Sequence, residues 1–199
     1  MEGLTLFKIA QFIILLTFAV FVSDLRKKKG MVPLLNSKLT LAMKICYPIL
    51  FCVYGFVIAT IESLSFLDFV ALAVTSIATS LVVKAKIDLR RYHTWAGYHF
   101  DTTELVAAGV YAFIRHPLYT GVYIFILGGL SNSIIHALWF LSGMWPVIPA
   151  CAVALLYVMV LLPIIASRET EFLAQEFGGE FLKYQGQVHA FLPLRKFKG

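Results

Sequence analysis

The stretch LTLFKIAQFIILLTFAVFV, residues 4–22, is almost entirely apolar. An α-helix needs about 20 predominantly apolar residues to cross the roughly 30 Å hydrocarbon core of a bilayer, so this run is long enough to span it. Apolar runs follow at 41–61, at 64–83 and, with polar interruptions, at 118–166, which is long enough for two crossings joined as a helical hairpin. The sequence therefore predicts an all-α protein, a polytopic transmembrane helical bundle of about five spans.

The composition favours one membrane domain. Of the 199 residues, 60% are hydrophobic and 14% are charged, whereas a soluble domain carries about 25% charged residues. We expect a single domain over residues 1–199, because a transmembrane bundle of this size normally forms one unit whose outer faces meet acyl chains. Residues 1–83 would form three N-terminal spans, and residues 84–199 a loop, the helical hairpin and a C-terminal tail.

The formal net charge of +6 comes from Lys and Arg side chains that gather at the ends of apolar runs. This placement is typical of membrane topology and of contact with anionic lipid headgroups, and it argues against nucleic-acid binding. The positive-inside rule assigns the basic clusters 26–29 and 84–91 to the cytoplasm, so the N-terminus and the turn near Glu62 are expected outside. Two further crossings return Arg168 to the cytoplasmic face.

Nothing in the sequence suggests a metal site. Cys46, Cys52 and Cys151 lie in apolar stretches without a CxxC pair or a His at ligand spacing, so they are expected to be small buried hydrophobes. Asp68 lies near one end of the third span and is expected at the membrane interface rather than as a buried proton carrier. Three histidines are expected at the surface or interface: His93, His99 and His189.

Two polar segments, 104–119 and 168–189, flank the hairpin and are therefore expected at the same, cytoplasmic, membrane face. The second carries apolar side chains at helical spacing on both sides of Gly178 and Gly179, and it should cover the membrane surface or the bundle. No Gly-rich phosphate loop follows a predicted strand, so a nucleotide-like cofactor would be held by helices and loops. The meeting of these two segments is the predicted cofactor site.

Residues 105–121 read LVAAGVYAFIRHPLYTG, and residues 169–193 contain Glu, Leu, Phe-Gly, Tyr, Val and Pro at a matching spacing. These motifs resemble the signature of the isoprenylcysteine carboxyl methyltransferase and phospholipid methyltransferase families, over about residues 88–193. The resemblance implies a methyltransferase that uses S-adenosyl-L-methionine.

The chain departs from the family pattern in three places. Thr170 stands where the family continues a double glutamate, so the sequence leaves open whether Glu171, besides Glu169, faces the site. An Arg that the family carries one turn earlier is replaced by Ile164 and Ile165, and Arg168 could substitute for it. The family's upstream turn is reduced to Asp88-Leu89 and His93-Thr94, with Trp95 out of register.

S-adenosylmethionine carries a carboxylate, an ammonium, a sulfonium and an adenine, so its site needs a cation, a carboxylate, aromatic faces and backbone groups. Arg115 is expected to pair with the methionine carboxylate in a bidentate fork. Glu169 is expected to take the ammonium or the ribose hydroxyls, and these two residues are the predicted catalytic residues. The predicted cofactor-binding residues are Leu105, Val106, Gly109, Tyr111, Arg115, His116, Pro117, Tyr119, Glu169 and Glu171.

The other motif residues have physical roles in this prediction. Tyr111 and Tyr119 offer aromatic faces to the adenine or the sulfonium. Pro117 should start a helix whose free backbone N–H groups point at the cofactor. His116 could bind the polar end of the cofactor through either ring nitrogen, and residues 105–109 could present backbone groups to the adenine edge.

The acceptor is expected to be a lipid or a lipidated molecule that enters from the bilayer. A carboxylate acceptor, as in isoprenylcysteine, needs only alignment and desolvation. An amine acceptor, as in phospholipid N-methylation, has to be deprotonated, which gives Glu169 or His116 a role as base.

Two other functions stay open. Sterol reductases look similar to this family in their C-terminal halves, so an NADPH-dependent membrane reductase is one alternative. Against it, Arg115 is the only Lys or Arg between Arg91 and Arg168, which is little charge for a phosphate-rich dinucleotide. The other alternative is a non-catalytic membrane scaffold.

Overall fold

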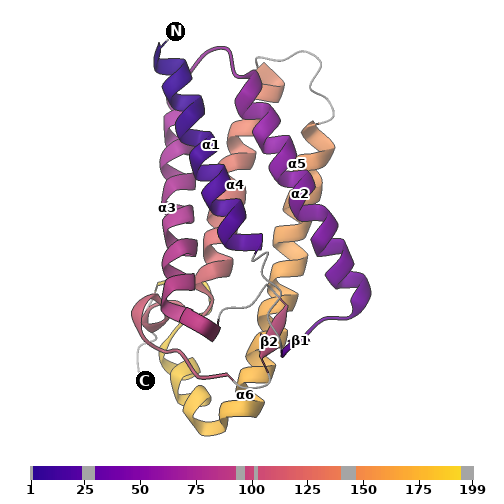
Figure 1. Ribbon diagram of the computed structural model, residues 1–199, viewed down its shortest axis with the longest axis vertical. Helices are drawn as coiled ribbons and strands as arrows, with labels where there is room; N and C mark the ends of the chain where they lie inside the picture. Colours follow the sequence, from indigo (N-terminus) through magenta and orange to yellow (C-terminus); the bar gives the residue numbers. More distant parts are fainter. Residues whose placement is uncertain (1, 24–29, 93–96, 101–102, 140–146, 194–199) are drawn as a thin grey trace.

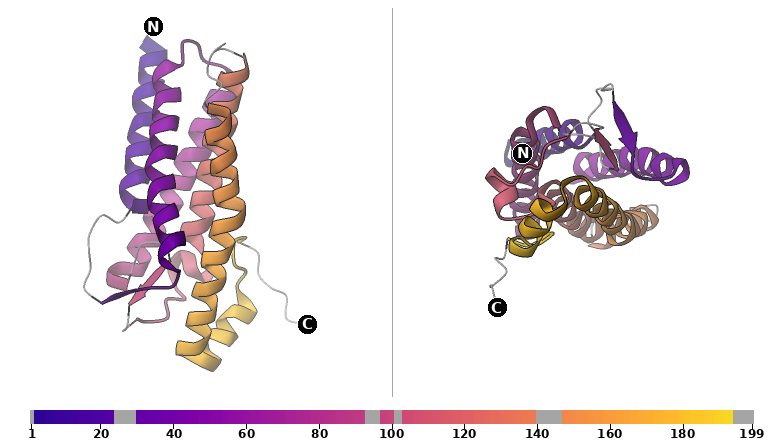
Figure 2. Two further views of the ribbon diagram at one scale, coloured as in Figure 1. Left: turned by 90° about the vertical axis from the view of Figure 1, so that its right-hand side faces the viewer. Right: turned by 90° about the horizontal axis from the view of Figure 1, so that it is seen from below.

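The computed structural model describes residues 2–23, 30–92, 97–100, 103–139 and 147–193. Long helices run side by side along one axis (Figures 1 and 2). They are α1 (Glu2–Ser23), α2 (Ser37–Thr60), α3 (Phe66–Leu89), α4 (Pro117–Trp139) and a continuous run of α5 (Val147–Leu156), the π-helical turn η3 (Tyr157–Leu161) and α6 (Leu162–Gln187).

The predicted all-α bundle is confirmed. Within the described residues, four helical runs are long and apolar enough to cross a membrane: Glu2–Ser23, Ser37–Thr60, Phe66–Tyr92 and Val147–Gln187. The remaining predicted span, the crossing that starts at Leu118, corresponds to α4, which runs between the same two ends of the bundle (Figure 1). Large apolar side chains point outward from these helices, with Leu16 67% and Ile77 63% exposed, as expected of surfaces that meet lipid.

The helices begin and end a few residues away from the limits of the apolar runs, because polar residues determine where each helix starts and stops. The second helix begins at Ser37 instead of residue 41, because the Asn36 side chain accepts a hydrogen bond from Leu39 N at 2.9 Å and caps it. The third helix begins at Phe66 behind a capping box formed by Ser65 and Asp68. It continues past residue 83 to Leu89, because charged residues that cannot lie in lipid still form good helix outside it.

The C-terminal tail differs most from expectation. We predicted that the last crossing ends near Ala166 and that a separate segment starts at Arg168, but α6 passes through both without a break. The helix bends at Gly178, whose φ of 50° and ψ of −123° are non-helical, as the Gly178-Gly179 pair predicts. In Figure 1 the part of α6 after the bend folds back beneath the bundle.

A two-stranded antiparallel sheet joins loops that the sequence did not pair. Strand β1 (Met31–Pro33) pairs with β2 (Tyr98–Phe100), with Val32 opposite His99. Two short helical turns lie in the same part of the chain: η1 (Arg90–Tyr92) and η2 (Gly109–Ala112). All of these elements lie at the end of the bundle opposite the N-terminus (Figure 1), so short irregular segments gather at one end.

Helices α3 and α4 pack closely because glycines face α3. A methyl group built on Gly121 would lie 2.5 Å from Val82 Cγ2 and 3.0 Å from the backbone oxygen of Ala78. A similar group on Gly128 would lie 2.7 Å from Val74 Cγ1. Small residues at such positions let helix backbones approach within a membrane.

We therefore expect Gly121→Ala to destabilise the protein by about 1–3 kcal/mol, because its methyl group overpacks the α3–α4 contact. The matched control is Gly186→Ala, since nothing lies within 4 Å of a methyl group at that helical position. Thermal unfolding of both purified variants checks this prediction. Equal midpoints for the two variants would show that the helices do not pack at Gly121.

Asp68 lies in the first turn of α3, near the end of the span, as the sequence indicates. Its side chain is fully buried, and its Oδ1 lies 2.6 Å from Nε2 of His136, which is also buried. The other carboxylate oxygen accepts hydrogen bonds from the backbone and the hydroxyl of Ser65. The two buried residues therefore join α3 to α4 inside the apolar bundle.

The predicted burial of the three cysteines holds for one of them. Cys151 is buried, Cys46 is half-buried, and Cys52 is exposed on α2. Among the described residues, no group of three or more His, Cys, Asp or Glu side chains could hold a metal ion.

Candidate active site

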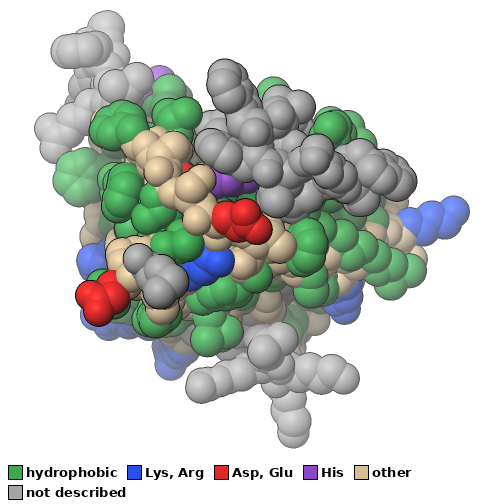
Figure 3. Space-filling model, turned by 90° about the horizontal axis from the view of Figure 1, so that it is seen from above, with side chains coloured by type: hydrophobic (Ala, Val, Ile, Leu, Met, Phe, Trp, Pro, Cys, Tyr) green, Lys and Arg blue, Asp and Glu red, His purple; other side chains and the backbone are tan. Residues whose placement is uncertain are grey.

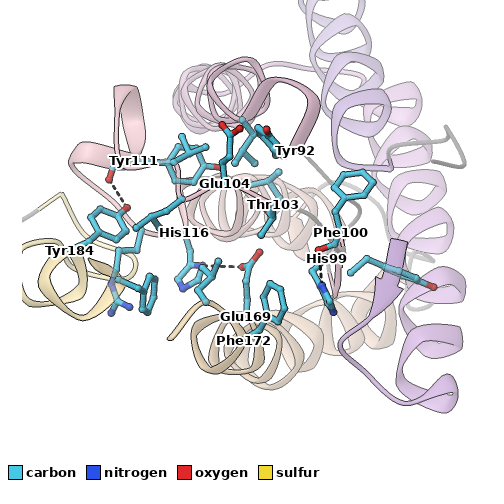
Figure 4. A pocket seen from close by; sticks show the side chains of 18 of the residues that line it. Tyr92, His99, Phe100, Thr103, Glu104, Tyr111, His116, Glu169, Phe172 and Tyr184 are labelled. Atoms are coloured by element: carbon cyan, nitrogen blue, oxygen red, sulfur yellow. Dashed lines mark hydrogen bonds and ion pairs between the residues drawn. The ribbon is translucent and has the colours of Figure 1, made fainter. Parts of the chain in front are cut away.

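A cavity opens at the end of the bundle opposite the N-terminus, where helices, strands and loops from four parts of the chain meet. Figure 4 shows the side chains around it, including Glu104, Tyr111, His116 and Glu169. The lining residues are Leu89, Tyr92, Tyr98, His99, Phe100, Thr103, Glu104, Leu105, Val106, Tyr111, Arg115, His116, Leu118, Tyr119, Glu169, Phe172, Leu173, Phe181 and Tyr184.

The two polar segments predicted to meet are hydrogen-bonded to each other. The backbone N–H groups of Arg115 and His116 donate to the carbonyls of His189 and Ala190, both at 2.9 Å. The Tyr184 hydroxyl donates to the backbone oxygen of Tyr111 at 2.6 Å. The segment before α4 and the tail after α6 therefore form one wall of the cavity.

Arg115 presents an unsatisfied donor beside the cavity. Its Nε donates to the backbone oxygen of Val188 at 3.0 Å, which fixes the guanidinium against the tail. No described residue accepts a hydrogen bond from its buried Nη1. Burial lowers the pKa of Arg115. Because an unpaired buried donor is costly, the group is suited to an anionic ligand.

His116 is enclosed by protein on both sides of its ring. Its side chain is 4% exposed, and its Nδ1 lies 3.2 Å from the Glu169 carboxylate, which is 31% exposed. Its Nε2 lies 3.2 Å from the Thr170 hydroxyl, and the ring stacks on Tyr119 at 5.5 Å between centroids. The Glu169 carboxylate thus faces the cavity, and its contact with the buried His116 ring fixes its position.

Aromatic side chains form much of the remaining wall. Tyr111 and Tyr119 are buried, and burial raises the pKa of Tyr111 well above its usual value, so it stays a neutral phenol. Across the cavity, the rings of His99 and Phe172 lie 3.9 Å apart. His99, expected at the surface or interface, lines the cavity through strand β2.

The structure does not bring every predicted residue to the cavity. Leu105 and Val106 line it, but Gly109 does not; with φ at 64°, it lies where a Cβ would meet the Asp88 carboxylate. That carboxylate accepts a hydrogen bond from the backbone of Val110 and pairs with Lys84. Gly109 therefore shapes the loop behind the site.

Three other expectations need correction. Pro117 starts α4 as predicted but does not line the cavity, whereas Leu118 and Tyr119 of the first helical turn do. Glu171 does not line the cavity, because its carboxylate pairs with Arg168 at 3.1 Å on an exposed part of α6. Arg168, as a result, does not stand in for the family arginine at the cavity. The upstream residues His93, Thr94 and Trp95 lie outside the described part of the chain.

Sequence reasoning missed the residues that close the cavity from the far side: Tyr98, His99, Phe100, Thr103 and Phe172. Phe172 had a signal, since it lies three positions after Glu169 on one helix face. Strand β2 is three residues long and shows no alternating pattern, so its side chains gave none.

These observations define a class: a helical membrane bundle with a polar and aromatic cavity at one end. Comparison with protein-family models, curated proteins and solved structures finds no match to this chain.

Proposed function

We propose that this protein is an S-adenosyl-L-methionine-dependent methyltransferase that acts on a membrane-soluble acceptor. The observation that carries the proposal is that Arg115 lines the cavity, and that its buried Nη1 has no hydrogen-bond partner among the described residues. The resemblance of residues 105–121 and 169–193 to the isoprenylcysteine carboxyl methyltransferase family supports the same conclusion.

The cavity residues fit the groups of S-adenosylmethionine. Arg115 would hold its carboxylate, and Glu169 or Glu104 its ammonium or ribose hydroxyls. Tyr111, Tyr119 and other ring faces of the wall would hold the adenine and the sulfonium. When bound, the cofactor supplies a methyl group already activated by the sulfonium.

The work of the protein in this proposal is alignment and exclusion of water. The guanidinium is held against Val188 and Glu169 against His116, so both charges are fixed before a ligand arrives. Preorganised charges in a partly dry site cost little reorganisation when the methyl group moves.

The acceptor in this proposal is a carboxylate on a lipid-like group, as in isoprenylcysteine. This choice of acceptor rests on the resemblance of residues 105–121 and 169–193 to the isoprenylcysteine carboxyl methyltransferase family, because Arg115 is already assigned to the carboxylate of the cofactor. The lipid part would come from the bilayer. An almost wholly apolar hollow between α2, α4 and α5, lined by Leu50, Phe125 and Ala154 among others, supports this route.

A phospholipid or amine N-methyltransferase is the second candidate, with Glu169 or His116 as base. A reductase has less support: among the described lining residues, Arg115 is the single Arg or Lys. A dinucleotide carries several phosphate charges that one cation does not neutralise.

Methyl transfer tests the proposal directly. Purified protein is incubated with methyl-labelled S-adenosylmethionine and a membrane extract, and the lipid-soluble label is counted. Base-labile label would identify an ester and thus a carboxylate acceptor; stable label would identify nitrogen or sulfur. Absence of protein-dependent label in extracts from several membranes would contradict the proposal.

We also propose that the cavity faces the cytoplasm. Basic residues of α3 and η1, among them Lys84, Arg90 and Arg91, lie at the cavity end. The opposite end, seen in Figure 3, presents mostly hydrophobic side chains and few charged ones. This asymmetry matches the positive-inside rule.

Cysteine labelling checks this orientation. In a background with the three native cysteines replaced by serine, Glu62→Cys should react with an impermeant maleimide in intact cells. Gly186→Cys, at the cavity end, should react only after permeabilisation. The reverse pattern would place the cavity outside. Labelling of both sites in intact cells would show that the two ends of the bundle do not lie on opposite sides of the membrane.

A further inference from the structure

The hydroxyl of Thr170 determines which ring nitrogen of His116 carries a proton. Thr170 Oγ1 donates its hydrogen to the backbone oxygen of Ala166 at 2.7 Å. A hydroxyl has one hydrogen, and a carbonyl oxygen can only accept. The same Oγ1 lies 3.2 Å from His116 Nε2, so in that contact the oxygen accepts and Nε2 donates.

The opposite side of the ring then needs a second proton. A neutral imidazole protonated at Nε2 has a bare lone pair at Nδ1. That Nδ1 lies 3.2 Å from an oxygen of the Glu169 carboxylate, which is also an acceptor. Two acceptors facing each other in a buried site repel, so a proton has to lie between them.

We infer that Thr170 is a positioning residue that keeps one extra proton shared between His116 and Glu169. The pair is then an imidazolium with a carboxylate, or an imidazole with a carboxylic acid, and its net charge is zero in both forms. Thr170 stands where the family pattern has the second of two glutamates. The role inferred for Thr170 therefore does not come from that pattern.

Other groups surround the pair. His116 also contacts the rings of Tyr119 and Phe191. The charged or titratable side chains that line the same cavity or the hollow on the Thr170 side of the ring are Tyr92, Tyr98, His99, Glu104, Tyr111, Arg115, Tyr184 and Glu171.

The shared proton sets the charge that a ligand meets. With it, the pair that lines the cavity with Arg115 carries no net charge. Without Thr170 as acceptor, neutral His116 can carry its single hydrogen on Nδ1 and donate it to Glu169, and the pair becomes an anion. This consequence for ligand binding rests on the proposed function, whereas the proton count rests on the hydrogen bonds alone.

The proton count is tested by nuclear magnetic resonance of 15N-histidine-labelled protein in detergent, with His116→Asn used to assign the His116 signals. In the wild type near neutral pH, Nε2 should carry a proton and Nδ1 should share one with Glu169, so neither nitrogen should show the 15N chemical shift of a bare lone pair. In Thr170→Val, the ring should carry its hydrogen on Nδ1, with Nε2 unprotonated. Thr170→Ser should restore the wild-type protonation of Nε2.

The matched control is Thr79→Val, which removes a buried helical hydroxyl that donates to Thr75 at the same i−4 position, away from the cavity. It should leave the protonation of His116 unchanged. The same Nε2 protonation in Thr170→Val as in the wild type, or a wild-type ring protonated on Nδ1 alone, would overturn the inference.

Binding of S-adenosylmethionine to the same samples separates the two claims. If the inference and the proposed function both hold, Thr170→Val binds more weakly at pH 8 than at pH 6 by a larger factor than the wild type does. If the cofactor binds neither protein while the protonation of Nε2 changes as expected, the proposed function fails and the proton count stands. If it binds both and the protonation of Nε2 does not change, the inference alone fails.

Discussion

Replacing Arg115 with alanine is expected to weaken S-adenosylmethionine binding roughly 100-fold, or by about 3 kcal/mol. The expected loss is large because Nη1 lacks a partner among the described residues, so the guanidinium is free to bind the ligand's carboxylate. Arg115→Lys should recover only part of the affinity, since an ammonium keeps the charge but not the planar fork. Isothermal titration calorimetry on protein in detergent or nanodiscs measures all three dissociation constants.

The matched control is Arg168→Ala. Arg168 pairs with Glu171 on an exposed part of α6 outside the cavity, so its removal should change the affinity less than about twofold. Arg115→Ala also loses the bond to Val188, so the unfolding midpoint of each variant has to be compared. An Arg115→Ala protein that is folded and binds with wild-type affinity would remove Arg115 from the site.

The second large effect concerns the buried pair at the other end of the bundle. His136→Leu is expected to destabilise the protein by about 3–5 kcal/mol, because it removes the partner of one oxygen of the buried Asp68 carboxylate and leaves that carboxylate only its hydrogen bonds from Ser65 among the described contacts. Adding Asp68→Asn to His136→Leu should recover part of this loss, since a neutral amide costs less to bury than a carboxylate. Thermal unfolding of the purified variants gives the comparison.

His189→Leu serves as control, because that histidine is half-buried in the tail and does not lie within a helix of the bundle. We expect a much smaller loss of stability for it. If His136→Leu were as stable as His189→Leu, the Asp68–His136 contact would not contribute to the fold.

The helices themselves were predictable because each apolar run is about as long as a bilayer is thick. Their ends were less so. The run at 64–83 gives no sign that α3 continues to Leu89, and the polarity change after Ala166 suggested a break where α6 continues. Hydropathy reports which solvent surrounds a helix, not where the helix ends.

The cavity was predictable in part. Arg115, His116 and Glu169 were recognised because their residue types and spacing suit a charged cofactor, and the parity of the crossings brought the two segments to one end. The wall from β2 was not, because it depends on pairing with residues 31–33, more than sixty positions earlier. The Asp68–His136 pair was missed because its two residues lie far apart in the chain and His136 lies inside an apolar run.

Photo-crosslinking of radiolabelled S-adenosylmethionine tests the central claim most directly. Purified protein is irradiated with the labelled cofactor, digested, and the labelled peptides are sequenced. We predict saturable labelling of peptides from residues 98–119 and 169–184, suppressed by unlabelled S-adenosylhomocysteine. Label that is not suppressed by the competitor, or that maps to the end of the bundle near Asp68 and His136, would contradict a cofactor site formed where the two segments meet.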